Sequence, residues 1–287
     1  MSRPVAGPGA RAAALRPPSV GETKEAARLV WRRLMGLLAV SLILLPSAGC
    51  HSARKAKPKP PPVPNEALYE RARDLLERRK FEQARQALTE IGTREVLSPE
   101  LDPLVKIAVA DSYFYDPGVA NLIEAQSRYT QFLTFYPSSP LAGYAQFQVA
   151  MCYFKQSPQP HHDQTYTRKA IEEFEKVRKV DPNGRFVRAA EQMRDRCMNK
   201  VATHDYQVGL FYFRRKAYAG VISRFKNLLE NYPRYEGTDG VYYYLGLALL
   251  RSGEGAEGRV YLEKVRRDYP SSKFASAAQQ ALVKAKG

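Results

Sequence analysis

The sequence has few cysteines and histidines, the residue types on which disulfide scaffolds and many metal sites depend. It contains three cysteines and four histidines among 287 residues. Cys50, Cys152 and Cys197 are too few for a disulfide framework, although Cys152 and Cys197 could either pair in an oxidising compartment or stay as free buried thiols. His161 and His162 are adjacent in a polar loop, with no cluster of cysteines or carboxylates to complete a metal site. We therefore expect no bound metal.

A working dinucleotide-binding motif is also missing. The segment from Gly253 to Gly258 matches G-x-G-x-x-G, but that pattern binds a dinucleotide only after a β-strand and with an acidic residue about 20 positions further on. Here a helical stretch precedes the glycines, and the residue 20 positions beyond Gly258 is Ala278. We interpret Gly253 as a turn residue and Gly258 as a small residue where two helices cross.

Catalytic constellations are equally scarce. His204 and Asp205 are neighbours, but no nucleophile stands at a recognisable elbow. An enzymatic alternative would need a site in inserted loops that depends on His161, His162 and His204. We expect no enzymatic activity and no cofactor.

Acidic residues are outnumbered, because 45 Lys and Arg against 29 Asp and Glu give a net charge of +16. Residues 1–49 carry seven basic and two acidic groups, and residues 51–64 add four basic groups, which leaves +7 for residues 65–287. Nucleic-acid-binding proteins concentrate their basic residues on one face or motif, and no such motif is present. Nucleic acid is therefore not an expected partner.

The amino-terminal apolar run is too short to remain as a membrane span. Leu34–Leu45 has 12 residues, against roughly 18 for a permanent transmembrane helix. It follows Arg32 and Arg33 and precedes small residues, which is the order of a secretory signal. The ending from Leu45 to Cys50 resembles a bacterial lipobox, so residues 1–49 are predicted to be a signal peptide.

Lipid attachment at Cys50 would anchor the mature protein to a membrane surface. The residue after it, His51, favours the outer membrane, and the long segment before Arg32 favours a true start near Val30. Residues 50–64 then form a linker rich in lysine and proline, which adopts extended polyproline geometry. This linker could touch anionic head groups or serve only as a spacer.

Residues 65–287 show a helical repeat. Tyr-Pro or Asp-Pro pairs end amphipathic stretches at 136–137, 181–182, 232–233 and 269–270, a spacing typical of 34-residue tetratricopeptide units with insertions. The predicted fold is all-α: a right-handed superhelical tetratricopeptide (TPR) solenoid of about five helix-turn-helix repeats. We expect units at about 66–99, 104–139, 144–184, 203–235 and 239–271, followed by a capping helix over 272–286.

Two features of the repeat are irregular. The second and third units carry extra residues between their helices, and a helix from Phe186 to about Val201 has no partner of its own and can continue into the fourth unit. The 18 tyrosines suit helix interfaces, where the ring is buried and the hydroxyl stays wet. Most of them are predicted to be packing residues, and a minority to line a binding surface.

Several segments are similar to the BamD family, tetratricopeptide lipoproteins of the outer-membrane β-barrel assembly machinery. The resemblance covers about Glu66 to Ala281, and its most specific part is the helix-turn-helix from His204 to Phe225. The joint from Phe135 to Ala145 and the insertion at Asp163–Thr165 also match. The sequence departs from the family in a shorter, glycine-rich fifth unit and in the first unit, where Glu95–Pro99 replaces a Tyr-Pro joint.

The resemblance implies a scaffold on the periplasmic face of the outer membrane. Its N-terminal units would receive the extended, aromatic C-terminal segment of unfolded outer-membrane proteins. Its C-terminal units would dock on a BamA-like barrel subunit, and other lipoproteins of the complex would be further partners. The implied groove residues are Tyr69, Tyr113, Tyr115, Tyr144 and Tyr153, and the implied partner-binding residues are Arg224, Tyr218 and Phe225.

The main alternative is another tetratricopeptide lipoprotein. A pilotin for a pilus or secretion secretin, or a cell-division coordinator, would share the signal, the anchor and the repeats. The residues from His204 to Phe225 favour the BamD family over both, because generic repeat motifs do not specify that segment.

Overall fold

A computed structural model describes residues 63–94 and 97–285. The predicted signal peptide, Cys50 and most of the linker lie outside the described residues. Contacts divide the chain into residues 1–60 and 61–287, and the description below concerns the second unit by itself.

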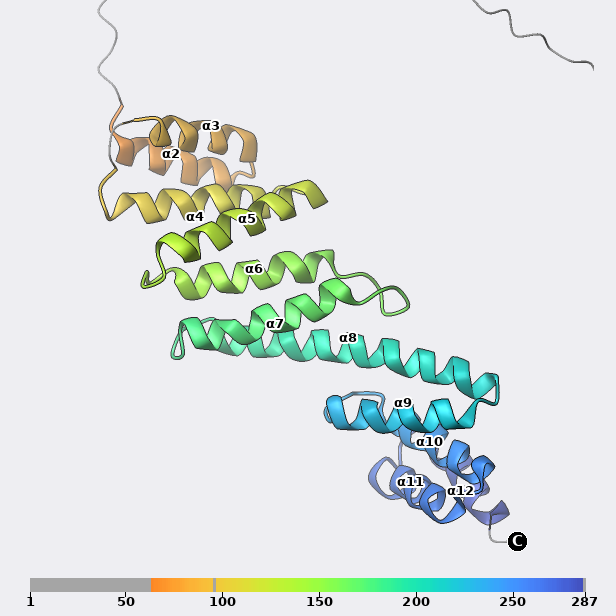
Figure 1. The fold of residues 1–287 in the computed structure, drawn as a ribbon. Helices are drawn as coiled ribbons and strands as arrows, with labels where there is room; N and C mark the ends of the chain where they lie inside the picture. Colours follow the sequence, from red (N-terminus) through yellow and green to blue (C-terminus); the bar gives the residue numbers. More distant parts are fainter. Residues whose placement is uncertain (1–62, 95–96, 286–287) are drawn as a thin grey trace, which may run out of the picture. The chain divides into compact units, whose positions relative to one another are not determined.

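The described residues are helical throughout, in the order α2 to α12 (Figure 1). Successive helices pack on one another, and short turns or loops join α2 to α3, α4 to α5, α6 to α7, α8 to α9 and α10 to α11 into hairpins, with α12 packed on α11. This is the predicted tetratricopeptide fold. The helices are α2 Asn65–Glu77, α3 Phe81–Gly92, α4 Leu101–Phe114, α5 Val119–Phe135, α6 Ala142–Gln156, α7 Thr165–Val180, α8 Val187–Arg214, α9 Tyr218–Asn231, α10 Thr238–Ser252, α11 Gly255–Asp268 and α12 Ala275–Lys284.

Small residues set the distance between the two helices of the last hairpin. A Cβ placed on Gly258 would lie 2.7 Å from the carbonyl oxygen of Gly246, and a Cβ on Gly246 would lie 2.9 Å from that of Gly258. The helices therefore meet backbone to backbone. Gly253 ends α10 with φ 93°, a left-handed conformation that glycine adopts without strain. Gly253 and Gly258 thus have the structural roles that the sequence predicted.

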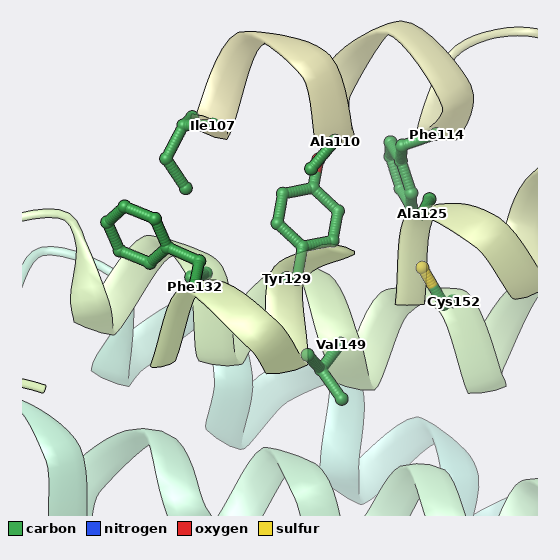
Figure 2. Packing of buried hydrophobic residues seen from close by; sticks show 9 residues of the cluster. Ile107, Ala110, Phe114, Ala125, Tyr129, Phe132, Val149 and Cys152 are labelled. Carbon is green, nitrogen blue, oxygen red and sulfur yellow. The ribbon is translucent and has the colours of Figure 1, made fainter. Parts of the chain in front are cut away.

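Large side chains fill the space between hairpins. In the cluster shared by α4, α5 and α6, the ring of Tyr129 is fully buried near Ala110, Phe114 and Cys152 (Figure 2). Burying a large apolar side chain contributes roughly 1.5–3 kcal/mol, and here the contacts come from both the tyrosine's own hairpin and the next one. One hairpin is consequently stable only against its neighbour.

The two cysteines in the described residues are free and buried. Cys152 lies in the cluster of α4 to α6, whereas Cys197 lies in a separate cluster on α8. Burial raises the pKa of each thiol to about 12, so both stay protonated at neutral pH. Of the two alternatives left open by the sequence, the structure has the unpaired one.

Helix α8 is twice the length of most others, with 28 residues. It runs without a break through the segment that lacked a predicted partner and into the first helix of the fourth hairpin. Its first half packs on α7 and its second half on α9. None of the helices in the described ranges is long and apolar enough to cross a bilayer.

We expect Gly258→Ala to lower the free energy of unfolding by about 1–3 kcal/mol, because overpacking at a helix crossing forces the backbones apart. Urea denaturation followed by circular dichroism measures the change. Gly92→Ala is the matched control, since a Cβ on Gly92 meets nothing within 4 Å. An equal loss of stability in both variants would contradict the close-crossing interpretation.

Candidate functional site

A buried carboxylate organises the first candidate surface. Asp111 of α4 accepts hydrogen bonds at Oδ1 from the hydroxyls of Tyr129 (2.5 Å) and Tyr144 (2.7 Å). The Tyr144 hydroxyl in turn accepts one from Nε2 of Gln148 (2.8 Å). Burial raises the pKa of Asp111, and the two tyrosine hydrogen bonds oppose that effect only in part. One carboxylate thus links α4, α5 and α6.

Two of the predicted groove tyrosines gather around this carboxylate. Tyr144 binds Asp111 directly, and Tyr69 of α2 lies near enough for the charge of Asp111 to act on it. Burial is the main cause of the raised pKa of Tyr69, and the negative charge of Asp111 adds to it. Sequence reasoning missed Asp111, although a lone acidic residue in the apolar run of α4 was a usable signal.

The other three predicted groove tyrosines have different surroundings. Tyr115, the residue after α4, is 49% exposed and lies near enough to Tyr144 to contribute to its raised pKa. Tyr113 lies beneath the guanidinium of Arg85, 4.7 Å from its ring centre. Tyr153 accepts a hydrogen bond from Gln126 of α5 at 2.8 Å.

The five tyrosines therefore do not share one surface. Residues two apart on a helix are separated by about 200°, so Asp111 and Tyr113 face different ways on α4. Residues nine apart are on opposite faces, which separates Tyr153 from Tyr144 on α6.

A pocket of about 330 Å³ lies between α3 and α5, over α4. We name it the α3–α5 pocket. Its apolar part contains Leu88, Val105, Val109 and Phe132, its aromatic edge contains Tyr113, Phe135 and Tyr136, and its basic side chains are Arg85, Lys106 and Arg128. Phe135 is 67% exposed, so its ring is available to a ligand.

Each basic side chain of this pocket already has an acidic neighbour. Arg85 pairs with Asp116 at 2.8 Å, and Arg128 pairs with Glu124 at 2.7 Å. Lys106 is 3.9 Å from Asp102. The pocket therefore offers fixed N–H donors around an apolar floor, with little excess charge.

The second candidate surface is on α8 and α9. Arg224 is half-exposed, pairs with Asp205 of α8 at 3.3 Å, and places its guanidinium 5.8 Å from the ring centre of Tyr212. These residues line a pocket of about 430 Å³, which we name the α7–α9 pocket. At its edge, Arg168 of α7 donates a hydrogen bond to the Tyr232 hydroxyl at 3.3 Å.

The two residues predicted to act with Arg224 differ in accessibility. Tyr218 is half-buried and packs edge-to-face on Phe213. Phe225 is fully buried and stacks on Tyr206, with ring centres 5.7 Å apart. The prediction of Phe225 as a partner-binding residue is therefore corrected: its ring fills the core beneath Gly209, and it can position Arg224 but cannot touch a partner.

The histidines in and beside the α6–α7 loop contact one another or the loop backbone. His161 and His162 are exposed, and their rings are in contact with centres 4.0 Å apart and planes tilted by 44°. Nδ1 of His204 bonds the carbonyl oxygen of Pro160 at 2.7 Å, which fastens this loop to α8. Within the ranges that the structure covers, no group of three or more His, Cys, Asp or Glu side chains could hold a metal ion.

Stacked helix hairpins with open pockets between their second helices define a tetratricopeptide scaffold, a class that binds other polypeptides. A tetratricopeptide family model matches residues 241–272. A second model, for the YfiO outer membrane lipoproteins, matches residues 61–248, nearly two thirds of the chain. The chain belongs to the YfiO family of outer membrane lipoproteins.

Curated relatives agree with this family. The chain is 26% identical over 251 residues to the outer membrane protein assembly factor BamD of Rickettsia prowazekii, covering 88% of this chain and 96% of the relative. It is 27% identical over 226 residues to BamD of Caulobacter vibrioides, covering 77% and 72%. The resemblance to BamD-like chains inferred from the sequence is confirmed.

We expect Asp111→Asn to change how stability depends on pH. Because the folded pKa of Asp111 is raised, its proton stabilises the fold fully below the unfolded pKa of about 3.9 and this contribution is lost as pH rises through the folded pKa. Asparagine keeps an oxygen acceptor for Tyr129 and Tyr144 but does not titrate. Between pH 4 and pH 7, urea unfolding should show the free energy of unfolding of the variant rising relative to that of the wild type. The rise should be about 1.4 kcal/mol for each pH unit by which the folded pKa of Asp111 exceeds the unfolded one. Parallel curves would contradict a perturbed Asp111.

Proposed function

We propose that this chain is a lipid-anchored scaffold on the periplasmic face of the outer membrane. In this role it binds unfolded outer-membrane proteins and a BamA-like barrel subunit during barrel insertion. The observation that carries the proposal is the match to outer membrane lipoproteins over residues 61–248, which spans both candidate surfaces. Two BamD assembly factors that align with most of the chain add support. No catalytic step is part of the proposal.

The proposed anchor is Cys50. Its support is the lipobox-like ending of the signal sequence together with the lipoprotein character of the family. Acyl chains attached at this cysteine would hold the protein stably at the membrane surface, because several chains bind far more strongly than one. The linker of residues 51–64 would then separate the anchor from the first helix at Asn65.

The proposed substrate site is the α3–α5 pocket. An extended segment ending in an aromatic residue brings a large ring and a terminal carboxylate. The ring suits the floor around Val109 and Phe132 and the exposed edge at Phe135, while Arg85 and Arg128 supply donors to the carboxylate. Of the five tyrosines predicted for the groove, Tyr113 lines this pocket. At the other surface, the negative charge of Asp111 would repel a ligand carboxylate.

The proposed partner surface for the barrel subunit centres on Arg224. Its guanidinium is half-exposed at the α7–α9 pocket and is oriented by Asp205 and Tyr212. A bidentate contact to a carboxylate of the partner is the interaction that such a fixed arginine makes best. Tyr218, which is half-buried, is the second residue proposed to act at this surface.

We expect Phe135→Ala to weaken peptide binding by about tenfold. A few residues supply most of the binding energy at an interface, and an exposed aromatic ring at a pocket is typical of them. The probe is a fluorescein-labelled decapeptide with a C-terminal phenylalanine and a free carboxylate, measured by fluorescence anisotropy. Ile123→Ala is the control, because Ile123 is an exposed apolar residue of the same helix outside the pocket. Equal affinity in both variants would remove the α3–α5 pocket from the proposal.

We expect Arg224→Glu to reduce copurification of the barrel subunit from native membranes by about tenfold or more, because a carboxylate would then face a carboxylate. Arg188 is an exposed arginine in the first turn of α8 and does not line the α7–α9 pocket, so Arg188→Glu makes the same charge change as a control. Thermal unfolding of both variants checks that the fold is retained. Copurification of Arg224→Glu at the wild-type level would exclude this surface.

A further inference from the structure

The carboxyl-terminal end of the chain contains a pocket that the proposed function does not use. It has a volume of about 450 Å³ and lies between α10, α11 and α12. We name it the C-terminal pocket. Its apolar floor contains Leu247, Leu250 and Ala281, and its basic side chains are Arg251, Arg259 and Lys284. Most of these residues lie beyond position 248, where the match to the outer membrane lipoproteins ends.

The basic side chains of this pocket have no acidic partners among the described residues. In the described part of the chain, no carboxylate lies within 4.0 Å of Arg251, Arg259 or Lys284. The carboxylates of the adjoining turn are engaged elsewhere: Glu254 accepts a hydrogen bond from the Ser252 hydroxyl, and Glu257 pairs with Lys226 at 2.8 Å. Within the described residues, the three cations that line this pocket are therefore not paired with a carboxylate.

Two of these side chains are held in position by other contacts. The guanidinium of Arg251 lies 4.9 Å from the ring centre of Phe213 and donates a hydrogen bond to the Tyr218 hydroxyl at 3.5 Å. Arg259 donates to the carbonyl oxygen of Ala285, which ties α11 to the end of α12. Side chains that are already ordered lose less conformational entropy when they bind a ligand.

The floor of the pocket includes a glycine. Gly255 begins α11 and lines the pocket, and a Cβ placed on it would meet only the Leu250 side chain at 3.9 Å. Leu247 and Leu250 are partly exposed. An apolar side chain of a ligand can therefore reach the floor between the basic groups.

We propose that the C-terminal pocket binds an acidic peptide segment of another protein. One large apolar side chain of that segment lies on Leu247 and Leu250, and flanking carboxylates bind Arg251, Arg259 and Lys284. A recess of this volume holds a side chain of a polypeptide, whereas a membrane surface is met by broad basic faces with protruding apolar groups. Charge complementarity selects the acidic segment, because uncompensated cations around a recess raise the local concentration of anions.

The steric test fills the recess without changing its charge. A peptide with two leucines between glutamates, labelled with fluorescein at its amino terminus and amidated at its carboxyl terminus, is titrated with the purified mature chain. We expect Gly255→Leu to lower the affinity about tenfold or more, since the new side chain occupies the floor. Ala256→Leu is the control, because Ala256 is exposed on the same turn and does not line the pocket. Equal affinity for both variants, or no binding by the wild type, would overturn the proposal.

The charge test separates a specific site from general attraction to a basic protein. We expect Arg259→Glu to weaken binding about tenfold or more, and Arg266→Glu, two turns further along α11, to change it less than twofold. A peptide with glutamine in place of glutamate should bind weakly at any salt concentration. Equal effects of the two charge reversals on peptide binding would overturn the proposal. It would also be overturned if the chain bound phosphatidylglycerol vesicles and Arg259→Glu abolished that binding without affecting peptide binding.

This proposal can fail or succeed independently of the proposed function. Arg224 and the residues of the α3–α5 pocket do not line the C-terminal pocket. Arg251 of this pocket does contact Tyr218 of the proposed partner surface, so Arg251 is not changed in the tests. The variants at Gly255 and Arg259 should therefore leave binding of the phenylalanine-ended peptide unchanged.

Discussion

The structure depends on one packing constraint: an isolated helix hairpin cannot bury its own apolar face. The fully buried ring of Tyr129 illustrates this, since its contacts come from α4 and α6 as well as from its own helix. Within the last hairpin, the distance between the two helices is set where small residues let them touch, at Gly246 and Gly258. Once that spacing is fixed, the second helices of successive hairpins stand apart, and the gaps between them become pockets over the intervening first helix.

Helix α8 modifies this arrangement locally. Because its 28 residues are shared between α7 and α9, these two helices pack on different halves of it. The contact between Arg168 and Tyr232 joins them across the remaining gap, and Tyr232 also lines a separate pocket of about 410 Å³ with Asn199. The exposed Arg224 lies in this part of the chain. An extension that looks irregular as a repeat thus has a definite consequence, because it opens the surface on which the proposed partner residue lies.

Much of this fold follows from local sequence patterns, and much of the site does not. The Tyr-Pro joints and the helical periodicity predict hairpins, because backbone restriction at proline and amphipathic spacing act within a few residues. Whether a tyrosine lines a pocket depends on its angular position and on the neighbouring helices. The separation of Tyr113 from Tyr144 and the burial of Phe225 are outcomes of that kind. Asp111 was visible as an acidic residue in an apolar helix, but its two hydroxyl donors come from helices distant in sequence.

The pockets also differ in how their charges are compensated. In the α3–α5 pocket, Arg85 and Arg128 are paired with carboxylates of the chain, so a ligand carboxylate must share or displace an existing partner. The net electrostatic gain there is small, and recognition rests mainly on apolar contact with the floor and with Phe135. In the C-terminal pocket, the acceptor that the described residues give Arg259 is the carbonyl of Ala285, so an anion there gains its attraction without displacing a described carboxylate. The same fold therefore offers an aromatic ligand one environment and an acidic ligand another, and the difference lies in where the chain places its own carboxylates.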